Sequence, residues 1–309
     1  MSKITIITPC YFNELNIPVY AQRMIENEST FPEGVTFEYV LVDDGSKDNT
    51  WAELEKFHAS YPHKVKIIKL VRNFGSTNAV YSALPYATGD CIAIISADLQ
   101  DPPAIIAKMY SHWQNGYKLV LANRTNREES FVQKLMANIT HGMVRKWGLS
   151  NLPAGGFDLN LFDKEVRDVI VTMDDKNSFF PYLLIWLGYE YVSIPYVRQK
   201  RELGKSTYTL TKKIKVFVDS FVAFSFFPIR LISVLGLLLG SFSLILIVVV
   251  VISKIMGGVP ITGWSSMMAV ILFVSSFQMI GLGIIGEYVW RGLESSRKRP
   301  NYIVDKVKQ

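Results

Sequence analysis

Short apolar runs alternate with helix-length stretches over the first two thirds of the chain. The apolar runs predict strands at residues 3–8, 37–42, 65–71, 91–96, 117–122 and 190–198. Helical spacing of apolar residues falls between them, at 16–28, 48–60, 77–87, 103–115 and 131–147. Alternation of this kind predicts an α/β fold in which a mainly parallel sheet carries helices on both faces.

The last third of the chain does not follow this alternation and instead contains two long apolar stretches. Residues 231–253 and 265–286 contain no charged side chain. Each stretch is long enough to cross about 30 Å of hydrocarbon as a helix. The alternative is a pair of buried core helices, which seldom run this far without a charge. Because the link between them is short, the two stretches predict a transmembrane hairpin over 231–289.

Basic residues flank this hairpin on both sides and predict its orientation. They are Lys212, Lys213, Lys215 and Arg230 before it, and Arg291, Arg297, Lys298 and Arg299 after it. The positive-inside rule then places the domain over 1–210 and the tail over 290–309 in the cytoplasm, at the cell membrane. Residues 211–230 begin with basic side chains and continue with apolar side chains at helical spacing. This pattern favours a helix that lies on the membrane surface. A helix packed against the domain is the alternative. No signal peptide is expected, because the first strand begins almost at Met1.

Charge and cysteine usage narrow the class of protein. The 309-residue chain has a formal net charge of +6. Much of the excess lies beside the apolar stretches and in 198–215, so anionic lipid or a lipid phosphate explains it better than nucleic acid. Cys10 and Cys91 are expected to be buried thiols rather than a disulfide.

Acidic and amide side chains follow three of the predicted strands. Glu14 comes after the first strand, Asp43 and Asp44 after the second, and Asp98 with Gln100 after the fourth. The carboxyl ends of parallel strands meet at one edge of the sheet, where ligands bind. Neither G-x-G-x-x-G nor a Walker A loop is present, which argues against a dinucleotide or P-loop site. The alternative is that all three groups are ordinary turn and cap residues.

An ordered set of motifs gives the chain a family resemblance. The motifs are TPCYFNE at 8–14, VDDGS at 42–46, RNFG at 72–75 and ADLQDPP at 97–103, followed by 186–188, 198–201, 204–208, 286–288 and 299–302. In this order they resemble the family 2 glycosyltransferases of the GT-A fold. Within that family the chain is similar to polyprenyl-phosphate glycosyltransferases, the group of dolichyl-phosphate mannose synthase and the bactoprenol glucosyltransferases. The resemblance covers almost the whole chain.

The resemblance implies a nucleotide-sugar site at the carboxyl edge of the sheet. Its residues would be Pro9, Tyr11, Glu14, Asp43, Asp44, Gly75, Ala97 and Asp98. Asp98 and Gln100 would hold Mg²⁺ or Mn²⁺ against the donor diphosphate, since such cations prefer hard oxygen ligands. Asp98, Asp158 and Arg124 would be the catalytic residues, with Arg124 near the phosphates.

Two positions depart from the pattern of the relatives. Ser96 stands where many relatives have an acidic residue, so the metal site has one fewer ligand to draw on. Asn160 stands where relatives often have an arginine, two positions after the aspartate that is Asp158 here. Asp158 is a base, an orienting residue or a turn residue. A phosphate acceptor is already ionised near neutral pH, so it needs little help from a base.

A basic cluster near the end of the predicted domain suits the acceptor. Arg198, Lys200, Arg201 and Lys205 would hold a lipid phosphate, which arginine favours through its planar fork of donors. The alternative is attraction to anionic headgroups without contact to the reacting phosphate.

Together these features predict an inverting enzyme that transfers one hexose from a UDP-sugar to undecaprenyl phosphate at the cytoplasmic membrane face. Glucose and N-acetylglucosamine are the favoured sugars. The alternatives are GDP-mannose as donor, another lipid acceptor, or a non-catalytic scaffold that binds nucleotide sugar. Gly281, Gly283 and Gly286 allow close helix contact, so a homo-oligomer is expected. The expected partners are the sugar donor, the polyprenyl phosphate and the lipid bilayer, with no nucleic acid.

Overall fold

The computed structural model describes residues 1–98, 100–124, 142, 144–146, 148–153, 157, 159–173, 179–199, 227–256 and 263–309. The chain divides into two compact units. The first comprises Met1–Ser220 together with Pro300–Gln309, and the second comprises Phe221–Arg299.

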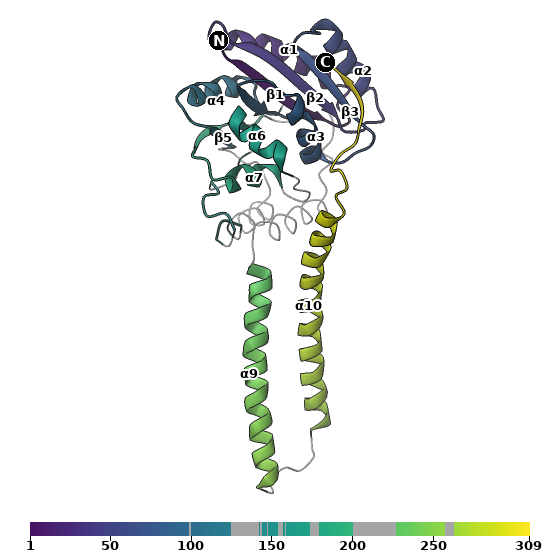
Figure 1. Cartoon of the computed structure of the whole chain (residues 1–309), viewed down its shortest axis with the longest axis vertical. Helices are drawn as coiled ribbons and strands as arrows, with labels where there is room; N and C mark the ends of the chain where they lie inside the picture. Colours follow the sequence, from purple (N-terminus) through teal and green to yellow (C-terminus); the bar gives the residue numbers. More distant parts are fainter. Residues whose placement is uncertain are drawn as a thin grey trace. The chain divides into compact units, whose positions relative to one another are not determined.

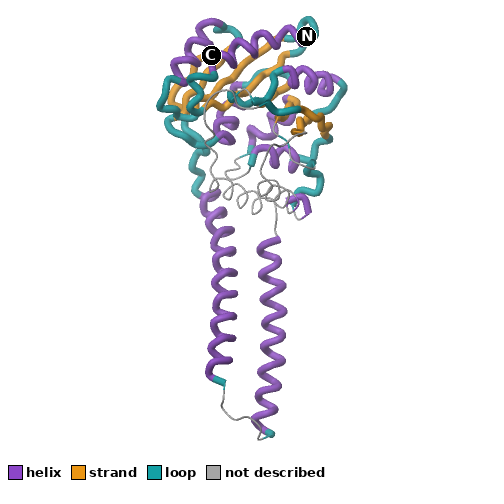
Figure 2. The backbone as a smooth tube through the Cα atoms, turned by 180° about the vertical axis from the view of Figure 1, so that it is seen from behind, coloured by secondary structure: helices purple, strands orange, loops and turns teal. Residues whose placement is uncertain are grey.

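An eight-stranded sheet forms the centre of the first unit (Figures 1 and 2). Its spatial order is β7-β5-β6-β4-β1-β2-β3-β8. The strands are β1 Lys3–Cys10, β2 Thr36–Asp43, β3 Val65–Leu70, β4 Cys91–Ile94, β5 Leu119–Arg124, β6 Leu159–Asp163, β7 Tyr191–Tyr196 and β8 Val304–Lys308. Neighbouring strands are parallel except where β6 pairs with β4 and β5 and where β8 pairs with β3. The prediction of a mainly parallel sheet is confirmed.

Helices cover both faces of this sheet, as its strands require. The helices are α1 Ile17–Asn27, α2 Thr50–Ser60, α3 Ser76–Ala83, α4 Ala104–Gln114, α6 Lys164–Thr172 and α7 Phe180–Trp186, with short 3₁₀ turns at Glu28–Thr30 and Leu84–Tyr86. Figure 1 shows α1, α2 and α4 on one face and α3, α6 and α7 on the other. Successive residues of β1, such as Ile6 and Ile7, are both buried, because each side of the strand meets a helical layer.

The last strand of the sheet comes from the end of the chain. After the second unit, Val304–Lys308 returns and pairs antiparallel with β3, with Ile67 opposite Lys308. Val71 N–H extends the pairing to the carbonyl of Ile303 at 3.1 Å. This strand covers an edge that would otherwise offer unpaired backbone groups to other chains.

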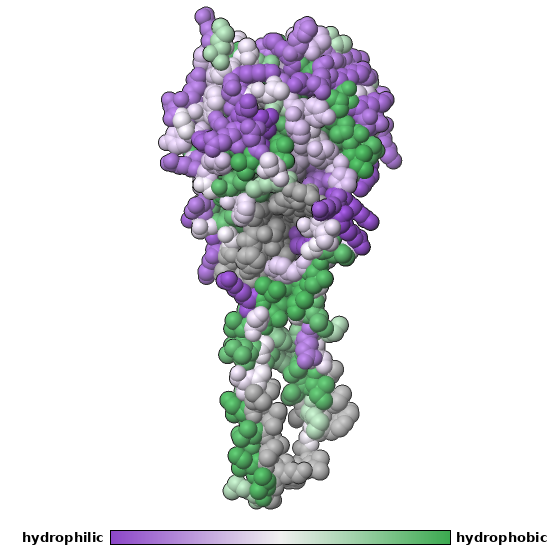
Figure 3. All heavy atoms as spheres, viewed as in Figure 1, coloured by the Kyte–Doolittle hydropathy of each residue, from purple (hydrophilic) through white to green (hydrophobic). Residues whose placement is uncertain are grey.

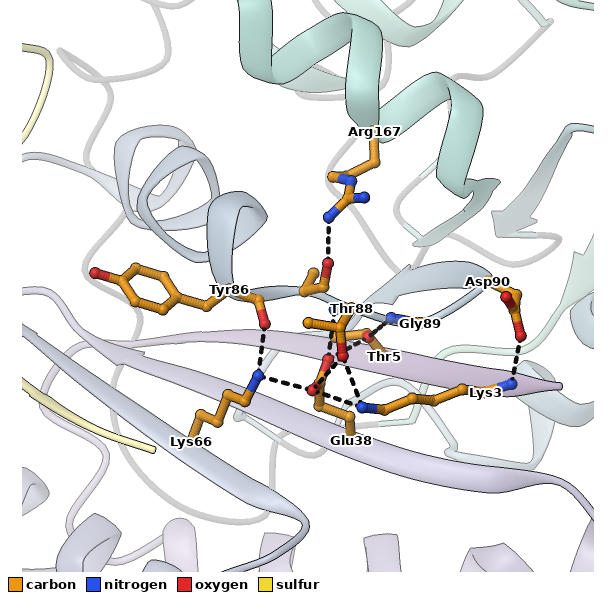
Figure 4. A network of polar contacts seen from close by, with 10 residues as sticks. Lys3, Thr5, Glu38, Lys66, Tyr86, Thr88, Gly89, Asp90 and Arg167 are labelled. Carbon is orange, nitrogen blue, oxygen red and sulfur yellow. Dashed lines mark hydrogen bonds and ion pairs between the residues drawn. The ribbon is translucent and has the colours of Figure 1, made fainter.

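A buried carboxylate ties the amino ends of the strands together (Figure 4). Glu38 of β2 is 2% exposed and accepts hydrogen bonds or ion pairs from Lys3, Thr5, Lys66 and Thr88. This network lies at the end of the sheet away from the predicted ligand edge, so its role is structural.

Two long helices make up the second unit. They are α9 Phe227–Ile255 and α10 Trp264–Ser296. A Cβ on Gly281 of α10 would lie 3.4 Å from the side chain of Ile232 in α9, so this glycine lies against the other helix of the unit. Large apolar side chains are exposed along both helices, for example Leu237 at 72% and Met279 at 68% (Figure 3).

The two stretches predicted to cross a membrane are thus helical, but the crossing itself is not supported. Counting only the side chains that the structure describes, no helix is long and apolar enough to span a bilayer. The predicted surface helix over 211–230 falls almost entirely outside the described residues. The predicted helix over 131–147 is described only in fragments.

Candidate active site

The carboxyl ends of β1, β2 and β4 meet at one edge of the sheet, as predicted. In the strand register Cys10 lies beside Asp43, and Ile7 beside Ile94. The amide of Asp44 donates to the carbonyl of Cys10 at 2.9 Å, which carries the pairing just past the end of β2. The segments that follow the three strands therefore start from adjacent positions.

Asp44 builds the loop that follows β3. Its Oδ1 accepts from the amide of Phe74 at 2.7 Å and its Oδ2 from the amide of Gly75 at 2.9 Å. Burial raises the pKa of Asp44 to about 6, although these two amides oppose the shift. Both oxygens already have partners within the protein. Asp44 therefore shapes the wall of the site by holding Gly75 at the start of α3.

Gly45 lets the two loops approach each other closely. Its φ of +67° is in the left-handed region, and an added Cβ would lie 2.4 Å from the carbonyl carbon of Arg72. Only glycine satisfies both conditions without displacing backbone. The Asp-Asp-Gly sequence thus has a steric reason as well as a chemical one.

Asp43 offers an unused hydrogen-bond acceptor at the end of β2. The residue is fully buried; its Oδ1 accepts from the amide of Ser46 at 2.9 Å, and its Oδ2 has no partner. Burial raises the pKa of this carboxyl. A buried acceptor without a partner costs roughly 1–3 kcal/mol, which a ligand N–H or O–H would recover.

The loop after β1 is fastened to the start of α2. Glu14 Oε2 accepts from the amide of Asn49 at 2.9 Å, so this carboxylate holds the loop in the free protein. The amide of Tyr11 donates to Asn13 Oδ1 at 2.8 Å, and the rings of Tyr11 and Phe12 contact edge to face with centroids 4.5 Å apart. Phe12 has a φ of +55° and is 45% exposed. Such strain is concentrated at ligand-binding loops. The sequence pattern did not single out Phe12, since nothing local marks its backbone conformation.

Asp98 and Gln100 lie together where the chain leaves β4. The Asp98 carboxylate is 12% exposed, and its Oδ1 accepts from the amide of Gln100 at 3.3 Å. Ser96 Oγ accepts from the amide of Asp98 at 3.4 Å, while Ala97 beside it is buried. One carboxylate and one amide carbonyl are hard oxygen donors of the kind that Mg²⁺ and Mn²⁺ take. These residues therefore fit a divalent cation that draws its other ligands from a diphosphate.

No larger cation site is present in the described part of the chain. There, no group of three or more His, Cys, Asp and Glu side chains could hold a metal.

Arg198 lies against this loop. A terminal nitrogen of its guanidinium is 3.8 Å from Asp98 Oδ2, and its Nε is 3.1 Å from Asp101 Oδ1. The basic character of Arg198 predicted an anionic phosphate partner, and the structure gives it two carboxylates. Asp101 belongs to the ADLQDPP motif after the fourth predicted strand, but no role in the site was predicted for it from the sequence.

Other predicted site residues are placed only in part. Pro9 lies within β1, and Arg124 is the last residue of β5, a strand parallel to β7 at the same edge. The side chain of Arg124, and the residues Asp158, Lys200, Arg201 and Lys205, lie outside the described residues. Their roles stay predictions.

Asn160, at the arginine position of the relatives, lies at the same edge. It pairs with Ile94 of β4 and Leu121 of β5, is 3% exposed, and its Oδ1 has no hydrogen-bond partner. An uncharged amide thus lies beside the site.

Comparison with known proteins agrees with this geometry. Residues 5–173 match the model of glycosyl transferase family 2. The chain is 35% identical over 303 residues to an uncharacterized glycosyltransferase, YkcC, of Bacillus subtilis, covering 98% of this chain and 93% of the relative. It is 31% identical over 308 residues to a prophage bactoprenol glucosyl transferase homolog of Escherichia coli, covering 99% and 100%. It is likewise 31% identical over 303 residues to the bactoprenol glucosyl transferase of Shigella phage SfX, covering 98% of each.

A solved structure supports the fold alone. Glucosyl-3-phosphoglycerate synthase from Mycobacterium tuberculosis, in complex with Mn²⁺, UDP-glucose and phosphoglyceric acid, superposes with a TM-score of 0.51 at 13% identity, covering 72% of this chain and 78% of that one. The family match, the full-length relatives and the sheet edge lead to one conclusion. The chain belongs to glycosyl transferase family 2 and has its GT-A fold.

Proposed function

We propose that this protein transfers one glucose unit from UDP-glucose to a polyprenyl phosphate, with undecaprenyl phosphate as the acceptor. Full-length similarity to bactoprenol glucosyl transferases is the observation that carries the proposal, since it extends beyond the family 2 domain through α9, α10 and β8. N-acetylglucosamine on UDP is the second donor to test.

The edge of the sheet suits the donor. Asp43 presents a buried carboxylate oxygen without a partner to an N–H of the base. Asp98 and Gln100 would hold Mg²⁺ or Mn²⁺, which when bound supplies positive charge for the departing diphosphate. Arg124, at the end of β5, would add a second positive charge there.

The reaction is a single in-line displacement with inversion. An oxygen of the lipid phosphate attacks the anomeric carbon and forms the new C–O bond. The bond from that carbon to the donor diphosphate breaks, and UDP leaves with the electron pair. The attacking phosphate is already ionised near neutral pH, so Asp158 orients the acceptor or the sugar instead of removing a proton.

The proposed acceptor is a lipid, so the enzyme has to reach it at a membrane. In the proposal, the uncharged stretches 231–253 and 265–286 cross the bilayer, and the basic residues on both flanks keep the family 2 domain on the cytoplasmic side. Exposed Leu, Ile, Val and Phe side chains along α9 and α10 support this, because a surface of that kind needs an apolar cover.

The test incubates the purified full-length protein with undecaprenyl phosphate and a panel of labelled UDP- and GDP-sugars, with Mn²⁺ or with EDTA. Glucosylated lipid is expected from UDP-glucose in Mn²⁺ only. Asp98→Asn should lower the rate at least about 100-fold, as expected for a group that stabilises developing charge. Asp305→Asn is the matched control, since Asp305 is exposed on β8. Absence of lipid-linked sugar from every donor would refute the proposal, and product formed in EDTA would refute the metal.

A further inference from the structure

Ion pairs of Arg198 connect two separate parts of the site. Its guanidinium lies 3.1 Å from Asp101 and 3.8 Å from Asp98. The side chains of Arg198, Asp98 and Asp101 are only 23%, 12% and 3% exposed. Shielding from water makes such charges depend strongly on one another.

Further bonds hold this segment in place. The hydroxyl of Tyr196 donates to Asp101 Oδ1 at 2.7 Å, and the amide of Gln199 donates to the carbonyl of Gln100 at 2.8 Å. In the sheet, β5 and β6 stand between β7 and β4. The segment after β7 therefore reaches past two strands to bind the loop after β4.

The arginine and a divalent cation would compete for one carboxylate. Asp98 is the carboxylate proposed to ligate Mg²⁺ or Mn²⁺, and the Arg198 guanidinium already lies beside its Oδ2. Two positive ions a few ångströms apart in a shielded site repel each other strongly. Asp101 would not share this conflict, because it is not proposed to ligate the cation; it lies 3.1 Å from Arg198 Nε.

We propose that Arg198 is a positioning residue and the resident counter-ion of the metal site. In the metal-free protein it neutralises Asp98 and Asp101. A divalent cation held by Asp98 would displace the Arg198 guanidinium from that carboxylate. The displaced guanidinium would then be available to an anionic phosphate. The inference rests on the proposed function for the identity of that anion, and it orders the reaction: donor and cation bind first, and the acceptor phosphate follows.

The test measures Mn²⁺ alone binding to the full-length, metal-free protein in detergent, by the electron paramagnetic resonance signal of the free ion. Arg198→Gln should bind Mn²⁺ at least tenfold more tightly than the unmodified protein, because the competing charge is gone. The Asp101→Asn variant should change affinity in the opposite direction and bind Mn²⁺ several-fold more weakly, since Asp98 is then the one carboxylate beside Arg198 among the described residues. Lys56→Gln makes the same charge change on the exposed face of α2 and should stay within twofold.

Thermal unfolding separates this role from simple support of the fold. Arg198→Gln should lower the Tm without metal, and saturating Mn²⁺ should close the gap to the unmodified protein. A structural role would lower the Tm equally in both conditions. The proposal is overturned if folded Arg198→Gln binds Mn²⁺ no more tightly than the unmodified protein. If that variant does not fold, unchanged Mn²⁺ affinity in Asp101→Asn overturns it. Sugar transfer is not part of either measurement, so failure here and failure of the proposed function are read separately.

Discussion

Replacing Glu38 with Gln should destabilise the first unit strongly at neutral pH and weakly in acid. Glu38 Oε1 accepts from Lys3 Nζ and Lys66 Nζ, both at 2.9 Å, and Oε2 accepts from Thr5 Oγ1 and the amide of Thr88, both at 2.7 Å (Figure 4). Glutamine has one acceptor oxygen and places an NH₂ group where the carboxylate accepts. At least two of these donors would then face another donor.

The size of the effect follows from the pKa. Burial alone would raise the pKa of Glu38, but the amide of Thr88, the hydroxyl of Thr5 and the two lysines outweigh it and lower the pKa from 4.5 to about 2. A lowered pKa means that the unfolded chain takes up the proton first as the pH falls. The carboxylate therefore contributes about 3 kcal/mol above pH 5, and this contribution is lost as the pH falls from about 4.5 to 2.

The free energy of unfolding can be measured by urea titration, monitored by tryptophan fluorescence. Both full-length proteins are measured in the same detergent. The Glu38→Gln variant should lose about 3 kcal/mol at pH 7, and the difference should shrink to roughly 1 kcal/mol at pH 3. Glu53→Gln is the matched control: its partner Lys56 is 72% exposed, so the loss should stay under about 0.5 kcal/mol. A loss below about 1 kcal/mol at pH 7, or a difference independent of pH, would refute the reasoning.

Three further predictions concern the site and the sheet edge. Gly45→Ala should cost about 2 kcal/mol or more in urea unfolding, because the added Cβ meets the backbone of Arg72 at a positive φ; full stability would contradict this. Carbon NMR of the Asp44 carboxyl should give a pKa near 6, well above its usual 3.8, and a value below 4 would contradict the role assigned to burial. Deleting residues 304–309 should lower the Tm and cause aggregation, seen by light scattering, since it uncovers the edge of β3; an unchanged monodisperse protein would show that β8 is dispensable.

Much of the sheet could be predicted because its signal is local. Each of the first four strands begins within one residue of its expected position, since a short apolar run between helices marks a buried parallel strand. Strand β8 could not be predicted in this way. It has only five residues, three of them charged, and pairs with β3 far back along the chain.

The site could be located from sequence, but its contacts could not. Acidic residues after parallel strands predict a shared edge, and the structure brings Asp43, Asp44 and Asp98 to the ends of β2 and β4, on either side of β1. That both oxygens of Asp44 bind the amides of Phe74 and Gly75 depends on the path of a loop some thirty residues later. Whether the charge of Arg198 meets a phosphate or a carboxylate likewise depends on the fold.

Ionisation of buried carboxyl groups has opposite effects on the stability of the fold at the two ends of the sheet. At the amino ends, Glu38 has every oxygen paired and a pKa of about 2, so its ionisation stabilises the fold. At the carboxyl ends, burial raises the pKa of Asp44 to about 6, so the folded protein holds a proton that the unfolded chain has lost, and stability falls as the pH rises from about 4 to 6. Asp43 adds a buried oxygen without a partner at the same edge. Near neutral pH, the carboxyl groups at the ligand edge therefore lower the free energy of unfolding. A donor nucleotide that pairs with Asp43 would remove part of this loss, so it should raise the Tm by more than its other contacts alone would.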